Sequence, residues 1–139
     1  MCGNSSDGCK CISEILSVIN ILQQNAECDD TCLETCDRGF LGCNASSLNC
    51  NTRPIMLYTC CGNGEAWSMP ISKDFDETTT SNVFRVEKVD GCCATFRVLV
   101  PSSDSSVSFP FVSTNSFFTM NLSCVCSLRC LQDTYIDCI

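Results

Sequence analysis

Hydrophobic and polar residues alternate along a long segment near the end of the chain, residues 118–131. One face of this segment would carry Phe118, Met120, Leu122, Cys124, Cys126, Leu128 and Cys130. The other face would carry Thr119, Asn121, Ser123, Val125, Ser127 and Arg129. A period of two is that of a β-strand with one buried face. The pattern therefore predicts one long half-buried strand whose inner face holds three cysteines.

Apolar residues near the start of the chain follow a different spacing. They recur at Ile12, Ile15, Leu16, Val18, Ile19 and Leu22, with polar residues at Ser13, Glu14, Ser17, Asn20 and Gln24 between and after them. This i, i+3, i+4 stripe is typical of an amphipathic helix. We expect the helix to pack on the domain's own sheet, and the pattern leaves open whether it contacts a neighbouring subunit instead.

A shorter helix is predicted further along the chain, in its cysteine-rich part. Thr31 and Glu34 have the spacing of a capping box, and Gly39 stands where a glycine would end the helix. Cysteines follow at positions 28, 32, 36, 43 and 50. Because no Cys-x-x-Cys occurs in the chain, this spacing does not indicate a structural metal site, and we expect none.

Two hairpins are predicted in the second half of the chain. Residues 55–61 read as a strand, Cys61-Gly62-Asn63-Gly64 as its turn and residues 65–69 as the return. In the second hairpin, residues 83–98, we expect a three-residue loop, Val89-Asp90-Gly91. That register pairs Lys88 with Cys92, Val86 with Ala94 and Phe84 with Phe96. It turns Cys92 inward and Cys93 outward.

These patterns predict a mainly β (α+β) fold, a cysteine-rich antiparallel sandwich or barrel preceded by the amphipathic helix. We expect residues 1–11 to form a flexible arm that bears cysteines, residues 12–50 a helical segment rich in cysteine, and residues 51–139 the β domain. Together they would make one compact domain.

Composition adds one unusual feature, since 16 of the 139 residues are cysteine. That share is typical of a disulfide scaffold, yet 45% hydrophobic residues and eight Phe also supply an ordinary core. Part of the cysteine therefore serves a purpose beyond folding, and cross-linking between subunits is the leading candidate. A thiol-rich metal store is the alternative.

Charge and missing residue types exclude several functions. A net charge of −8 with only eight Lys and Arg argues against nucleic-acid binding. The absence of histidine removes His-based catalysis and mixed Cys/His zinc sites, so we expect neither an enzyme nor a bound cofactor. The apolar segment 12–22 is too short and too polar to span a membrane. The chain also opens without the pattern of a secretion signal, which we interpret as synthesis in a cytoplasm followed by later oxidation.

The cysteines divide by predicted position. A bond between subunits needs cysteines on mobile or outward-facing segments, and Cys2, Cys9, Cys11, Cys93 and Cys138 are therefore the candidates for inter-subunit disulfides. Those on inner faces, Cys92, Cys124, Cys126 and Cys130, are candidates for buried thiols or for bonds within one chain.

Several short segments together resemble the CotY/CotZ/ExsY family of Bacillus spore-surface proteins. They are Asn51-Thr52-Arg53-Pro54, Leu57-Tyr58-Thr59, Phe84-Arg85-Val86-Glu87, Val89-Asp90, Cys93-Ala94, Arg97-Val98-Leu99, Leu122-Ser123-Cys124-Val125-Cys126 and Cys130-Leu131. The resemblance implies a structural protein of the exosporium basal layer or spore crust. Such a protein would be made in the mother-cell cytoplasm, assemble with itself and with paralogous spore-surface proteins into a hexamer-based two-dimensional lattice, and become cross-linked by disulfides.

Overall fold

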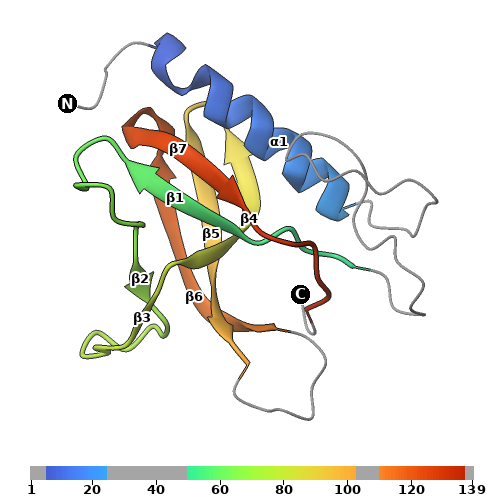
Figure 1. Cartoon of the computed structure of the whole chain (residues 1–139), viewed down its shortest axis with the longest axis vertical. Helices are drawn as coiled ribbons and strands as arrows, with labels where there is room; N and C mark the ends of the chain where they lie inside the picture. The colour runs from blue at the N-terminus through green and yellow to red at the C-terminus, as the bar shows by residue number, and fades with distance from the viewer. Residues whose placement is uncertain (1–5, 25–49, 103–109, 137–139) are drawn as a thin grey trace.

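A computed structural model describes residues 6–24, 50–102 and 110–136 (Figure 1). The predicted second helix around Thr31, the cysteines from 28 to 43, Cys2 and Cys138 lie outside these residues. The helices are η1 (Ser6–Cys9), α1 (Lys10–Gln24) and η2 (Leu122–Cys124). The strands are β1 (Ile55–Thr59), β2 (Met69–Pro70), β3 (Thr80–Ser81), β4 (Val83–Asp90), β5 (Cys93–Pro101), β6 (Phe111–Asn121) and β7 (Val125–Cys130).

Five strands form one antiparallel sheet in the order β6-β5-β4-β1-β7, and β2 pairs with β3 in a separate small sheet. The two edge strands, β6 and β7, are joined only by the three residues of η2. A flat five-stranded sheet would separate its edges by about 19 Å, whereas four Cα steps span at most about 14 Å. The sheet must therefore curl, as a partly open barrel does, so that its edges approach each other at the η2 end.

Helix α1 lies across the curled sheet and packs mainly on β4 (Figure 1). Its buried residues, Ile12, Leu16 and Ile19, meet the inward side chains of the strands in one core cluster. Phe84, Phe96 and Phe118 form the aromatic part of that cluster, with ring centroids 4.8–6.3 Å apart. The predicted mainly β antiparallel fold with an N-terminal amphipathic helix is confirmed, and the helix packs on its own sheet.

The long strand predicted over residues 118–131 is divided in two. Asn121 caps η2, since its side-chain oxygen accepts hydrogen bonds from the backbone N–H of Ser123 at 3.0 Å and from that residue's hydroxyl at 2.8 Å. The chain turns there and continues in β7 at the opposite edge of the sheet, where the register with β1 shifts near its end. As a result Val125 is buried and Cys126 exposed, so the predicted inner position of Cys126 is wrong.

The hairpin of β4 and β5 has a different register from the predicted one. Its turn occupies Gly91 and Cys92, with Gly91 at a φ of 61°, and Phe84 pairs with Val98 instead of Phe96. The pairing of β4 with β5 differs from the predicted one because Glu87 occupies a register shift between Val86 and Lys88. Its carboxylate there accepts hydrogen bonds from Arg85 at 2.8 Å and Arg97 at 3.0 Å. From Val83 to Val86 the slide is two residues, so the predicted inner positions of Phe84 and Val86 are kept. Beyond the shift it is three residues, so Val89 turns inward and Lys88 outward.

Candidate functional site

Eight cysteines from different elements gather at the end of the sheet where its edges approach each other. We call this the thiol end, and it comprises Cys9, Cys11, Cys60, Cys61, Cys92, Cys93, Cys124 and Cys126. Backbone contacts connect its parts: Cys93 pairs with Asn121, Leu122 N–H donates to the carbonyl of Cys92 at 2.7 Å, and Cys60 N–H donates to that of Cys124 at 3.1 Å. The start of α1, the β4–β5 turn, η2 and the end of β1 thus meet in one region (Figure 1).

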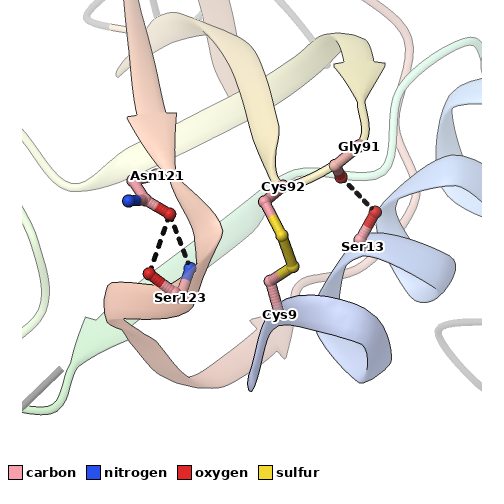
Figure 2. Close-up of a disulfide and its surroundings, with 6 residues drawn as sticks. All are labelled: Cys9, Ser13, Gly91, Cys92, Asn121 and Ser123. Carbon is pink, nitrogen blue, oxygen red and sulfur yellow. Dashed lines mark hydrogen bonds between the residues drawn. A yellow bond between two sulfur atoms is a disulfide. The ribbon is translucent and has the colours of Figure 1, made fainter. Parts of the chain in front are cut away.

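One disulfide of the thiol end joins Cys9 to Cys92 (Figure 2). Their Cα atoms are 5.7 Å apart, and Cys9 is only 3% exposed. Beside the bond, the hydroxyl of Ser13 donates to the carbonyl of Gly91 at 2.6 Å. The bond and the hydrogen bond together fasten the first turn of α1 to the β4–β5 turn, 83 residues away in the sequence.

A second disulfide joins Cys60 to Cys126, with Cα atoms 5.1 Å apart. Cys60 follows β1 and Cys126 lies near the start of β7, so the bond crosses two paired strands. Both of its residues are exposed, in contrast to Cys9.

The thiol end also presents thiols outside these two bonds. Within the described part of the chain, Cys11 and Cys93 are free and exposed, and Cys124 is free and half-buried. No group of three or more His, Cys, Asp or Glu side chains in that same part is arranged to hold a metal ion. None of its helices is long and apolar enough to cross a membrane.

The predicted cysteine candidates are placed as follows. Cys11 and Cys93 are exposed, and their bonding between subunits stays a prediction. Cys9 is not on a mobile arm, because residues 6–9 form η1 and hold it against the β4–β5 turn, where it bonds within the chain. Among the inner candidates, Cys92 and Cys126 bond within the chain, Cys130 is disulfide-bonded and Cys124 is half-buried.

Two of the segments that carry the family resemblance, Asn51-Thr52-Arg53-Pro54 and Phe84-Arg85-Val86-Glu87, contribute to a buried polar cluster near the start of β1. Arg53, 3% exposed, makes a two-pronged ion pair with Asp133 at 2.7 and 3.0 Å. Arg85 donates to the hydroxyl of Thr52 at 2.9 Å and to the carbonyl of Asn51 at 3.2 Å. Burial lowers the pKa of the Arg85 guanidinium, and the charge of nearby Glu87 opposes that shift.

This polar cluster has a structural role that the sequence motifs did not reveal. Asn51 and Asp133 lie more than eighty residues apart in the chain, yet Asn51 bonds the backbone of Ile136 in both directions, at 3.0 and 2.9 Å. The cluster therefore holds the C-terminal segment against the start of β1. The signal available in the sequence was one arginine, Arg85, inside an apolar strand and another, Arg53, just before one.

Comparison with known proteins gives one match. Residues 1–110 of the chain match the family model described as spore coat protein Z. No curated protein and no solved structure matches the chain. The matched residues include α1, β1, the β4–β5 hairpin and six cysteines of the thiol end, so the family match covers most of the site and most of the chain.

Proposed function

Because the chain belongs to the spore coat protein Z family, whose members are structural proteins of the spore surface, we propose that its copies assemble into a two-dimensional lattice locked by inter-subunit disulfides. The lattice would be hexagonal and would form the exosporium basal layer or the spore crust. Its partners would be further copies of the chain and paralogous spore-surface proteins. We propose no catalytic role for it.

The observation that carries this proposal is the presence of exposed thiols that the fold does not use. The monomer has its own core, an N-terminal helix packed on the sheet, and two disulfides at the thiol end. Cys11 and Cys93 belong to neither bond and both are exposed. Cys93 lies on a hydrogen-bonded strand, so its position is fixed relative to the sheet. Thiols held in fixed, exposed positions are suited to bonding a neighbour that docks in one orientation.

Packing between copies should come before cross-linking. A disulfide requires Cα atoms within roughly 4.4–6.8 Å, so its partners must already be held side by side. The order of events is then synthesis in the mother-cell cytoplasm, packing into the lattice, and bond formation that makes the lattice resistant to denaturant.

Replacement of Cys2, Cys11, Cys93 and Cys138 by serine tests the proposal. Cys9 is left in place because its loss would break the bond to Cys92. We expect the variant to form ordered arrays by electron microscopy, and these arrays should dissolve in denaturant without reductant. Cys124→Ser, which removes a half-buried free thiol, is the matched control and should leave arrays that need reductant. Absence of arrays from the wild-type protein would refute the assembly, and resistance of the fourfold variant would show that other cysteines form the cross-links.

A thiol-rich metal store is the alternative function, and eight cysteines gathered at one end of the sheet are the observation in its favour. Elemental analysis of protein purified under reducing conditions separates the two. A stoichiometric content of zinc or copper would favour storage, whereas its absence together with ordered arrays would favour the structural role.

A further inference from the structure

The two disulfides of the thiol end differ in how open they are to attack. A disulfide is exchanged when a thiolate approaches one of its sulfur atoms, so access decides which bonds react. In the Cys9–Cys92 bond, Cys9 is 3% exposed and Cys92 is packed against the core. In the Cys60–Cys126 bond both residues are exposed. The first bond is thus less accessible to thiols in solution than the second.

Free exposed thiols occur at this same end, and that of Cys93 is separated along the sheet from Cys60 of the open bond. Cys93 begins β5 and Cys60 follows β1, and β4 lies between these strands. Two strand spacings amount to about 10 Å, which exceeds the Cα separation that a disulfide allows. Cys93 also lies on the outer face, opposite in direction to its neighbour Cys92. The outward thiol of Cys93 is therefore positioned to meet the open disulfide of a copy that docks on this end.

We propose that the Cys60–Cys126 disulfide is an exchange site whose substrate is an exposed thiol, that of Cys93 or Cys11, on a second copy of the chain. The thiolate of the second copy attacks one sulfur of the bond, a new sulfur–sulfur bond forms between the two copies, and the bond within the first copy breaks. The departing sulfur leaves as a thiolate and takes up the proton that the attacking thiol gave to solvent. One disulfide is consumed and one is formed, so the step needs no oxidant.

This inference deepens the proposed function, because it rests on copies lying side by side in the array. The oxidising equivalents of the cross-links are then held, before the copies become cross-linked, in an exposed bond within each chain. Each exchange also releases a new thiolate at Cys60 or Cys126, which can attack the next copy. Cross-linking would then spread through an array that air does not reach.

The test uses the full-length oxidised protein at high concentration under argon with a metal chelator present. Interchain bonds are read by non-reducing electrophoresis after alkylation, their partners by peptide mapping, and free thiols by maleimide counting before and after. Three variants are compared with the wild type: Cys60→Ser with Cys126→Ser, Cys11→Ser with Cys93→Ser, and, as the matched control, Cys9→Ser with Cys92→Ser. Circular dichroism verifies that each variant is folded.

Wild-type protein should form interchain bonds under argon with an unchanged number of free thiols, and a bond from Cys93 or Cys11 to Cys60 or Cys126 should be found by mapping. Removal of the open disulfide, or of the two exposed thiols, should abolish these bonds, while the control variant should keep them. The rate should rise with pH because the thiolate is the attacking form. Should the Cys60/Cys126 variant fail to fold, the Cys11/Cys93 variant still decides the outcome.

Two results would overturn the exchange. One is a set of interchain bonds that appears only with oxygen and lowers the thiol count by two for each bond. The other is a set of oxygen-independent bonds that maps to other cysteines. Microscopy of the same samples keeps the two proposals apart: arrays without oxygen-independent bonds refute the exchange alone, whereas absence of arrays refutes the lattice and leaves the bond map to decide the exchange.

Discussion

Gln23 offers a sharp test of how α1 is held on the sheet. Its side chain is 4% exposed and bridges two other segments. The amide nitrogen donates to the carbonyl of Val86 in β4 at 2.8 Å, and the amide oxygen accepts from the backbone N–H of Arg53 at 3.0 Å. One side chain therefore satisfies a buried acceptor and a buried donor that lie on separate segments.

Gln23→Leu keeps the approximate size of the side chain and removes both hydrogen bonds. It leaves the carbonyl of Val86 and the N–H of Arg53 buried without these partners, at a cost of roughly 1–3 kcal/mol each. Burial of a leucine in place of the amide returns roughly 1–2 kcal/mol. We therefore expect a net loss of about 3 kcal/mol in the free energy of unfolding. With a urea m-value of about 2 kcal/mol/M, the unfolding midpoint should fall by about 1.5 M.

The assay is urea unfolding of the oxidised protein followed by circular dichroism. Gln24→Leu is the matched control, since Gln24 is the next residue of the same helix and is exposed. That variant should change the free energy of unfolding by no more than about 0.5 kcal/mol. A loss below about 1 kcal/mol for Gln23→Leu, or equal losses for the two variants, would show that the bridge does not hold the helix in this way.

Two further predictions concern charged side chains. Asp133→Ala should lower the free energy of unfolding by about 3 kcal/mol because it leaves the buried guanidinium of Arg53 without its carboxylate, while Asp76→Ala, at an exposed position, should have little effect in the same urea titration. Glu77 accepts hydrogen bonds from the N–H of Thr79 and the hydroxyl of Ser72, which lower its pKa below the ordinary 4.5. These contacts should therefore stabilise the β2–β3 loop above about pH 4.5, and the stabilisation should be lost as the pH falls through the lower pKa of Glu77 in the folded protein. An NMR titration of the Glu77 carboxylate with a midpoint at or above 4.5 would contradict this.

Local periodicity predicted the elements better than it predicted how they join. The stripe from Ile12 gave α1 and its buried face, since a helix repeats its contacts every few residues. The strand pattern of residues 118–131 was correct for Phe118 and Met120 and again for Leu128 and Cys130, and it was inverted at Val125 and Cys126. It could not show that Leu122–Cys124 carries the chain from one edge of the sheet to the other, because both edges bury one face with the same alternation.

The register of the β4–β5 hairpin failed for a related reason. The sequence offered Gly91 as the turn residue, and Gly91 is indeed in the turn with a positive φ. Its position within the turn depends on the register shift at Glu87, which is stabilised by Arg85 and Arg97. Ion pairs of this kind involve a residue ten positions away, so no pattern of apolar and polar residues signals them.

Topology also explains why the cysteines could not be paired from the sequence. Cys9 and Cys92 are brought together because α1 begins beside the β4–β5 turn, and Cys60 and Cys126 because β1 and β7 are neighbours in the curled sheet. Neither proximity follows from spacing along the chain.

The parts that hold the fold are separate from the exposed cysteines, and this separation bears on how the protein works as a building unit. The polar cluster around Arg53 and the core hold the fold without using Cys60 or Cys126, whose side chains are exposed after β1 and near the start of β7 at little cost to packing. Cysteines at such positions can change bonding partners while the sheet stays intact, because the strands are fixed by their own hydrogen bonds and by Phe84, Phe96 and the rest of the core. A subunit that must dock first and form disulfides afterwards requires a fold that is independent of the cysteines that change partners. If instead the fold depended on Cys60–Cys126, transfer of that bond to a neighbouring copy would unfold the subunit that it was meant to secure.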